Sequence, residues 1–228
     1  MSVWAVVVSR VGRGAKSRLA SVLDPDRRQD LATAMLADVL GVCTSPAAAL
    51  DGVVAVVDDP GAAMLADRRG ALAIPDAGGD MNRAAAAGVR AAQSHGATTV
   101  IVLPGDIPLI SPSDLHALLT AAADAPCAVV VGASRDGQGT NALLLRPPGA
   151  IAPAFGPPSV ERHVRLAEAA GALTCVLTNL GLALDIDTPS DLAVLLAFLD
   201  LPVGPATAGF LAESSSLVRQ LQLQLTRS

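Results

Sequence analysis

The chain has 228 residues, a length that suits one domain with a substantial core. Hydrophobic residues make up 51% of the chain but aromatic residues only 2%, so the core must consist mainly of Ala, Val and Leu, which favours close packing of helices on a sheet. The formal net charge is −5 and the basic residues form no long stripe. This argues against a nucleic-acid-binding protein, whose affinity rests on neutralising phosphates.

The apolar stretches of the sequence are all shorter than the ~20 residues of a membrane span. The first, residues 3–8, is also too short for the apolar region of a signal peptide and follows no cationic segment. Cys43, Cys127 and Cys175 are odd in number and lack the spacing of a metal site, so we expect buried thiols. We therefore expect a cytoplasmic protein without a membrane partner.

Short β-branched runs alternate with helical patterns along most of the chain. Residues 3–8 are all apolar, as in a strand buried on both faces. Residues 28–41 carry apolar side chains at helical spacing. Further strands are predicted at 53–57, 71–74, 99–103, 127–132, 142–145 and 173–177, and further helices at 60–68, 82–94, 112–123 and 159–170. This alternation predicts a mostly parallel α/β sheet with helices on both faces.

The segment after residue 177 is less regular. Thr188 or Asp187 is expected to cap a last helix that runs through Leu199, as Ser111 is expected to cap the helix 112–123. Residues 200–228 are mixed and polar at their end. We expect one domain over residues 1–200, followed by a C-terminal extension, 201–228, that serves as an appendage or an oligomer contact.

The first candidate functional segment, residues 12–19, follows the first predicted strand. Ligands of doubly wound sheets bind at the carboxyl ends of strands, and the first strand-to-helix loop is a favoured place. Gly12 and Gly14 let the backbone approach phosphates, while Lys16 and Arg18 bring positive charge. The spacing fits neither a Walker A loop nor GxGxxG. A solvated basic turn is the alternative, and position and composition favour phosphate binding.

Two acidic segments are candidates for a metal site. Asp106 follows the strand 99–103 between Pro104 and Pro108, and a carboxylate there suits a Mg²⁺ ion that bridges phosphate oxygens. In the segment 184–191, strand alternation would send Asp185 and Asp187 to the same face. Each carboxylate could instead cap a helix. The pairing of Asp106 with Asp187 favours the metal interpretation.

Two turns could hold an anionic substrate. Thr140 and Asn141 follow a Gly-rich turn, and Gly156 lies in a Pro-rich turn that leads to a helix start near Ser159. A helix N-terminus offers free N–H groups to a carboxylate or phosphate, although each turn alone could be an ordinary loop. The three histidines are dispersed and are expected at the surface, with His163 as a possible exception. The absence of G-x-S-x-G disfavours a serine hydrolase.

Together these motifs resemble the 2-phospho-L-lactate guanylyltransferase family of coenzyme F420 biosynthesis, whose bacterial members include phosphoenolpyruvate guanylyltransferases. The resemblance covers roughly residues 3–197, and the combination of Lys-Ser-Arg-Leu with Gly-Thr-Asn is more specific than any single motif. The segments that carry it are residues 15–20, 23–28, 34–40, 105–108, 139–141, 155–159 and 185–192.

The resemblance implies a Rossmann-like nucleotide-diphospho-sugar transferase fold with a small antiparallel extension. It also implies GTP as donor, Mg²⁺ as cofactor and pyrophosphate as a product. By the same resemblance, Asp106 and Asp187 would bind the metal, and Lys16 and Arg18 the triphosphate. The acceptor would be held by Thr140, Gly156 and Ser159, with Asn82 and Asn141 as further candidate substrate contacts.

Other functions stay open at this point. A cytidylyltransferase or a molybdopterin guanylyltransferase would share the fold, and a non-catalytic nucleotide-binding module would bind GTP without releasing pyrophosphate. A homodimer is also possible. Lys16 is the only lysine in an Ala-, Val- and Arg-rich chain, which suggests a GC-rich bacterial genome. Because bacterial members of the family are associated with phosphoenolpyruvate, we expect that acceptor over phospho-L-lactate.

Overall fold

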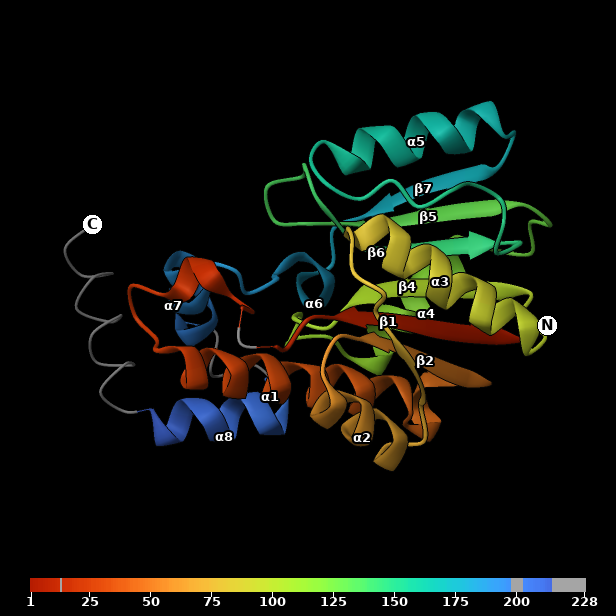
Figure 1. Ribbon diagram of the computed structural model, residues 1–228. Helices are drawn as coiled ribbons and strands as arrows, with labels where there is room; N and C mark the ends of the chain where they lie inside the picture. The colour runs from red at the N-terminus through yellow and green to blue at the C-terminus, as the bar shows by residue number, and fades with distance from the viewer. Residues whose placement is uncertain (13, 198–202, 215–228) are drawn as a thin grey trace.

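The predicted strands form one seven-stranded sheet in the order β3-β2-β1-β4-β6-β5-β7 (Figure 1). The computed structural model describes residues 1–12, 14–197 and 203–214. Only β6 runs antiparallel to its neighbours, β4 and β5, which confirms the mostly parallel α/β sheet. The strands are β1 (Val3–Ser9), β2 (Gly52–Val57), β3 (Leu72–Pro75), β4 (Thr99–Pro104), β5 (Ala128–Ala133), β6 (Thr140–Arg146) and β7 (Leu173–Leu177).

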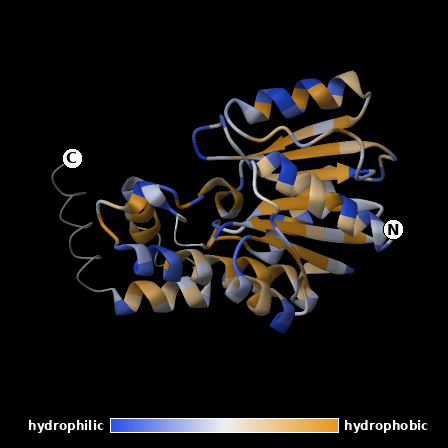
Figure 2. Cartoon of the chain, viewed as in Figure 1, coloured by the Kyte–Doolittle hydropathy of each residue, from blue (hydrophilic) through white to orange (hydrophobic). Residues whose placement is uncertain are grey.

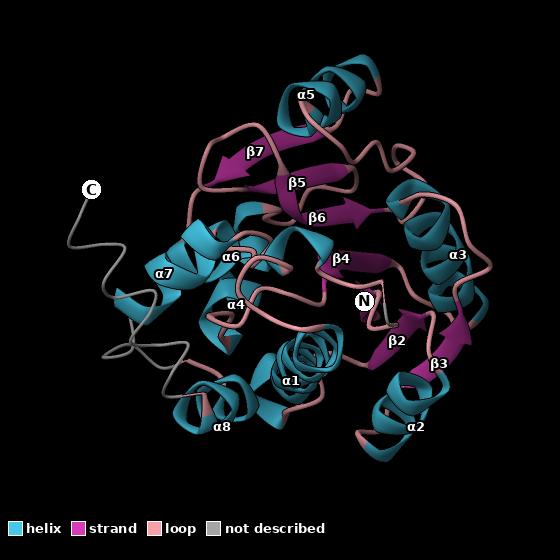
Figure 3. Ribbon diagram, turned by 60° about the vertical axis from the view of Figure 1, so that its left-hand side comes forward, coloured by secondary structure: helices cyan, strands magenta, loops and turns pink. Residues whose placement is uncertain are grey.

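Helices cover both faces of the sheet, as Figure 3 shows from the side. One face packs against α1, α2 and α4, and the other against α3 and α5. The helices are α1 (Pro25–Cys43), α2 (Pro60–Arg68), α3 (Met81–Ser94), α4 (Pro112–Ala121), α5 (Ser159–Ala169), α6 (Leu180–Ala183), α7 (Pro189–Ala197) and α8 (Pro205–Glu213). Short 3₁₀ turns at Ser17–Leu19 and Pro46–Ala48 complete the order. Among these helices, none is long and apolar enough to cross a membrane.

Aspartate caps start three of the helices. The carboxylates of Asp24, Asp59 and Asp80 accept hydrogen bonds from the backbone N–H of the third residue of α1, α2 and α3, respectively. These bonds satisfy N–H groups that have no partner within the helix. The predicted Ser111 cap of α4 is confirmed, and it forms a capping box with Asp114. Local side-chain chemistry therefore fixes where these helices begin.

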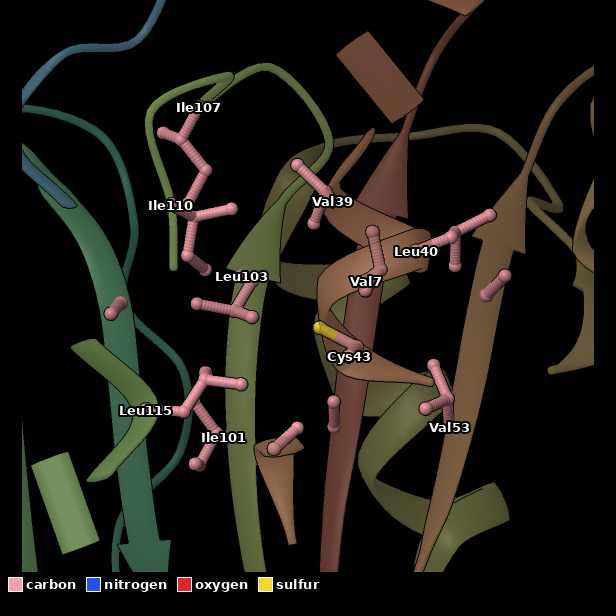
Figure 4. Close-up of a cluster of buried hydrophobic side chains, with 14 of the residues drawn as sticks. Val7, Val39, Leu40, Cys43, Val53, Ile101, Leu103, Ile107, Ile110 and Leu115 are labelled. Carbon is pink, nitrogen blue, oxygen red and sulfur yellow. The ribbon is translucent and has the colours of Figure 1, made fainter. Parts of the chain in front are cut away.

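The core is built from aliphatic side chains, as the composition predicts. Figure 2 shows the apolar strands, and Figure 4 shows part of the cluster between the sheet, α1 and α4. On the other face, Gly88 lets α3 lie directly on the sheet. A Cβ at Gly88 would stand 2.2 Å from Cγ1 of Val6, which a van der Waals contact does not permit. With few aromatic side chains to fill the core, small residues such as Gly88 allow the helices to pack closely on the sheet.

A third hydrophobic cluster lies beyond the end of the sheet and joins α1, α7 and α8. The carboxylate of Asp38, in α1, accepts hydrogen bonds from the backbone N–H groups of Ala206 and Thr207 (2.9 and 2.8 Å) and so caps α8. The guanidinium of Arg27 stacks over the ring of Phe210 at 4.3 Å. The part of the C-terminal extension that the structure describes therefore packs as a helix along α1 (Figure 1).

Two predictions are wrong in detail. Residues 184–188 form an irregular loop between α6 and α7, not a strand. Only Cys43 is buried, and burial raises the pKa of its thiol to about 12, whereas Cys127 and Cys175 are partly exposed. The predicted helix end at Leu199 lies outside the described residues, within which α7 ends at Ala197.

Candidate active site

The ends of β1 and β4 lie against each other because Gly105 has no side chain. Its N–H donates a hydrogen bond of 2.9 Å to the carbonyl oxygen of Val8. A Cβ at this position would lie 2.5 Å from the Cβ of Ser9, so any larger residue would force the two strand ends apart. The loops that follow β1 and β4 therefore begin side by side, at the sheet edge where doubly wound folds bind ligands.

Lys16, Asp106 and Asp187 form one cluster of charges between these loops. The ammonium of Lys16 donates a hydrogen bond to Asp106 and lies 2.8 Å from Oδ1 of Asp187. The Lys16 side chain is only 8% exposed. Three candidate residues from distant parts of the sequence thus meet. Lys16, which was expected on the triphosphate, lies between the two carboxylates.

The loop between α6 and α7 is held in place by Ile186. This side chain is fully buried in the cluster beyond the sheet, and its N–H donates a hydrogen bond of 3.1 Å to the carbonyl oxygen of Asp106. The Oδ2 atom of Asp191 accepts hydrogen bonds from the backbone N–H groups of Asp187 and Thr188, and Thr188 caps α7 in return. The carboxylates of Asp185 and Asp187 consequently lie near Asp106, although no strand alternation orients them.

The cluster shifts the proton affinity of its members. Burial lowers the pKa of the Lys16 ammonium, but the charges of Asp106 and Asp187 outweigh this effect and hold the pKa above its ordinary value. Burial raises the pKa of Asp187, but the Lys16 charge and hydrogen bond dominate and leave the pKa lowered. Both groups are therefore charged near neutral pH.

Asp185 is a third carboxylate that the sequence analysis did not select for the site. It accepts a hydrogen bond of 3.0 Å from the amide of Asn141, which also donates to the carbonyl oxygen of Ala183 (3.3 Å). Burial and the neighbouring Asp106 charge raise the pKa of the Asp185 carboxyl. Asn141, a predicted substrate contact, thus orients a carboxylate beside the cluster. The alternation of Asp185 with Asp187 was the available signal.

Thr140, Ser159 and Gly156, the expected acceptor contacts, line one cavity. The hydroxyls of Thr140 and Ser159 are 3.0 Å apart, and both residues are buried. Asn82, from the first turn of α3, binds both backbone groups of Phe155: its Oδ1 accepts from the N–H (2.5 Å) and its Nδ2 donates to the carbonyl oxygen (3.2 Å). The Asn82 amide therefore fixes the turn that carries Gly156.

Two cavities meet at the carboxylate cluster. The first, about 490 Å³, extends along the ends of β1 and β4. The second, about 480 Å³, lies beside β6 and the start of α5. The residues that line both are Met81, Pro104, Asp106 and Asp187. Lys16 faces the first cavity only; Thr140, Ser159 and Gly156 line the second. Each of these volumes can accommodate a ligand of small-molecule size.

Two arginines add positive charge to the second cavity. Arg18, which was expected on the triphosphate, lines this cavity instead of the first; its side chain is 74% exposed and lies 3.7 Å from Oδ2 of Asp187. Arg135, which the sequence analysis did not identify, pairs with Asp191 at 3.1 Å. The cavity is therefore lined by hydroxyls, guanidinium groups and carboxylates together, a mixture that suits an anionic ligand with a bound cation.

The pH dependence of stability should reveal the buried His163. Burial, with a smaller contribution from the Arg162 charge, lowers the pKa of this imidazole from 6.5 to about 4. Between these values the unfolded chain binds the proton and the folded chain does not, so stability falls as the pH drops. The shift is worth at most about 3 kcal/mol, present above pH 6.5 and lost by about pH 4.

Urea unfolding of the wild type and His163→Gln at pH 7, 6, 5 and 4 checks this expectation. The stability difference between the two proteins should shrink as the pH falls, because glutamine does not titrate. Curves that run parallel across this range would contradict the lowered pKa.

Solved structures define the class of fold. A candidate nucleotide-diphospho-sugar transferase from Desulfovibrio desulfuricans G20 superposes with a TM-score of 0.77 at 19% identity, covering 97% of this chain and 99% of that one. A CMP:2-keto-3-deoxy-manno-octonic acid synthetase complexed with CTP gives a TM-score of 0.56 at 18% identity, covering 88% and 99%. The chain therefore has the fold of the nucleotide-diphospho-sugar transferases and related nucleotidyltransferases.

Sequence comparison then defines the family. The family model described as guanylyl transferase, CofC like, matches residues 4–200. The phosphoenolpyruvate guanylyltransferase of Rubrobacter xylanophilus is 43% identical over 199 residues, which cover 86% of this chain and 95% of that protein. The protein of the same name from Conexibacter woesei is 41% identical, with 86% and 87% covered. The chain belongs to the CofC-like guanylyl transferase family, as the motifs suggested.

Proposed function

We propose that the protein transfers GMP from GTP to phosphoenolpyruvate with release of pyrophosphate, as a step of coenzyme F420 biosynthesis. The observation that carries the proposal is the meeting of two cavities at Asp106 and Asp187. A transfer between two small substrates needs two binding spaces whose ligands touch at the reacting phosphorus. The names of the relatives from Rubrobacter and Conexibacter support the choice of substrates.

The first cavity is assigned to GTP and the second to the acceptor. Lys16 and the glycine-containing loop after β1 line the first, which suits a triphosphate. Thr140 and Ser159 offer hydroxyls in the second, where Arg18 and Arg135 add positive charge. Phosphoenolpyruvate carries one carboxylate and one phosphate, and both groups accept hydrogen bonds from such donors.

The protein forms no covalent bond to either substrate in this reaction. A phosphate oxygen of the acceptor attacks the α-phosphorus of GTP; the new oxygen–phosphorus bond forms as the bond to the bridging oxygen of the β-phosphate breaks, and pyrophosphate leaves. The attacking phosphate is largely ionised near neutral pH and needs no strong base. Because both substrates are anions, positioning and charge compensation dominate. Lys16 lines the first cavity and contacts Asp106 and Asp187, which line both.

We also propose that Asp106 and Asp187 hold Mg²⁺. The residues fit this ion in two respects. Both carboxylates contact the same ammonium, so their oxygens converge on one small volume, and Oδ1 of Asp106 is buried with no hydrogen-bond partner among the described residues. Within that part of the chain, no group of three or more His, Cys, Asp or Glu residues is placed for a metal. Two carboxylates suit Mg²⁺, which keeps waters and takes phosphate oxygens; when bound it would neutralise phosphate charge.

Pyrophosphate release with each of the four nucleoside triphosphates tests the donor. GTP should support turnover with phosphoenolpyruvate, and the others should support little. A preference for CTP would favour the cytidylyltransferase alternative. Binding of GTP without pyrophosphate release from any acceptor would favour a non-catalytic module. Location in the cytoplasm and a homodimer stay predictions from the sequence.

The acceptor preference is expected to be phosphoenolpyruvate over 2-phospho-L-lactate, by about tenfold in kcat/KM. C2 is planar in phosphoenolpyruvate and tetrahedral in 2-phospho-L-lactate, and a rigid cavity wall can discriminate between these two shapes. The turn at residues 155–159 is such a wall, because Asn82 binds Phe155 through both backbone groups and two prolines follow. Measuring kcat/KM for both acceptors and for 3-phosphoglycerate at saturating GTP checks it. A preference for either of the others would overturn the acceptor but not the guanylyl transfer.

A further inference from the structure

His163 lies behind the wall of the second cavity and contacts two parts of that wall. It projects from α5, is fully buried and does not line the cavity. Its Nδ1 is 3.0 Å from Oγ1 of Thr140, and its Nε2 is 2.9 Å from the backbone nitrogen of Ala154. The ring also packs edge-on against Phe155, with centroids 5.3 Å apart. One side chain therefore connects β6 with the turn that carries Gly156.

The backbone contact fixes which ring nitrogen carries the proton. A backbone N–H can only donate, so Nε2 of His163 must accept the hydrogen bond from Ala154 and is unprotonated. A neutral imidazole then has its proton on Nδ1, which faces Thr140. The Nδ1–H group donates to the hydroxyl oxygen of Thr140. The hydrogen of that hydroxyl is consequently not used by the ring.

This tautomer determines whether the hydroxyl pair of Thr140 and Ser159 can donate a hydrogen bond into the cavity. Thr140 and Ser159 have two hydroxyl hydrogens, of which their mutual 3.0 Å hydrogen bond uses one. Ser159 donates that bond, so the hydrogen of the Thr140 hydroxyl remains for the cavity, which Thr140 lines. With the proton on Nε2, Thr140 would donate to the ring and Ser159 to Thr140, and the pair would offer the cavity no donor.

We propose that His163 is a positioning residue that holds the Thr140–Ser159 hydroxyl pair as a hydrogen-bond donor toward the anionic acceptor; this role rests on the proposed function. The anion it serves is the carboxylate or phosphate of the acceptor, because both are pure hydrogen-bond acceptors when ionised. His163 itself touches neither substrate. Its effect should therefore appear in the KM of the acceptor and not in the KM of GTP.

Two substitutions separate the two ring contacts. In His163→Gln the amide reaches the place of Nε2, so it can accept from Ala154 but loses the donor to Thr140. In His163→Asn the amide stands in for Nδ1, so it can donate to Thr140 but loses Ala154. His163→Gln should raise the KM of phosphoenolpyruvate on the order of fivefold, the effect of losing one neutral hydrogen bond, because the Thr140 hydroxyl is no longer held in the orientation that donates to the acceptor. His163→Asn should raise it by less than about threefold, with the KM of GTP unchanged in both.

A Thr140→Val background provides the coupling test. Because His163 acts through the Thr140 hydroxyl, Thr140→Val combined with His163→Gln should raise the KM of phosphoenolpyruvate no further than Thr140→Val alone. Additive effects would overturn the proposal. An effect of His163→Asn as large as that of His163→Gln would do the same, because it would indicate a packing role only.

The ring tautomer can be measured without any substrate. Long-range ¹H–¹⁵N NMR spectra of the full chain, with the His163 signal assigned by its loss in His163→Gln, should show a protonated Nδ1 and an unprotonated Nε2 from pH 8 to pH 5. A protonated Nε2 would overturn the inference whichever acceptor the enzyme uses. If the tautomer is as expected and phosphoenolpyruvate is not turned over, the proposed function fails, and the tautomer still supports the donor role of the hydroxyl pair.

Discussion

Asp106→Asn should lower kcat by about a thousandfold or more while the protein stays folded. Asp106 lines both cavities, and its Oδ1 is buried without a hydrogen-bond partner in the described part of the chain. An amide fills the same volume but carries no charge for Mg²⁺. Loss of several kcal/mol of charge stabilisation at the transferred phosphorus corresponds to a rate effect of about this size.

Pyrophosphate release at saturating GTP and phosphoenolpyruvate measures the effect, and circular dichroism with a thermal melt checks the fold. Asp67→Asn, an exposed aspartate on α2, is the matched control and should keep wild-type turnover. Turnover of Asp106→Asn within about tenfold of the wild type would remove Asp106 from the metal site. The guanylyl transferase family would stand, because it rests on sequence comparison.

The inner strands of this fold could be predicted because their residues are buried on both faces. In β1 and β2 nearly every position is buried, and such strands have continuous apolar runs. The start of α1 was predicted three residues late. Its first turn, from Pro25, has no buried apolar residue, so the helical spacing of apolar side chains could not reveal it. Helix α8 was not predicted at all. Its stabilisation comes from Asp38 and Arg27, which are distant in sequence.

The candidate site was predicted through residue types at strand ends, and its geometry was only partly foreseen. Asp106 follows β4 directly, so sheet topology alone brings it near the loop after β1. The position of Asp187 depends on the burial of Ile186 and on the hydrogen bond from Ile186 to Asp106, which no local pattern encodes. The role of His163 could not be predicted either, because its hydrogen-bond partners Thr140 and Ala154 come together only in the folded structure.

Lys16→Ala should lower kcat/KM for GTP by about tenfold to a hundredfold and should also make stability depend on divalent cations. The ammonium lies between Asp106 and Asp187, with Asp185 close by. Without it, the carboxylates of Asp106 and Asp187 would repel each other uncompensated, and a triphosphate would add further negative charge. The loss of a hydrogen bond from a charged donor is worth ~1.5–3 kcal/mol, which gives the expected range.

The cation dependence separates this explanation from a simple loss of packing. In the variant, Mg²⁺ can take the place that the ammonium leaves, so it should raise the melting temperature of Lys16→Ala at pH 7 more than that of the wild type. Arg68→Ala, an exposed arginine on α2, is the control and should respond as the wild type does. Equal responses of Lys16→Ala and the wild type would mean that Lys16 does not compete with a cation for these carboxylates. An unchanged KM for GTP would mean, in addition, that the loop after β1 does not bind the triphosphate.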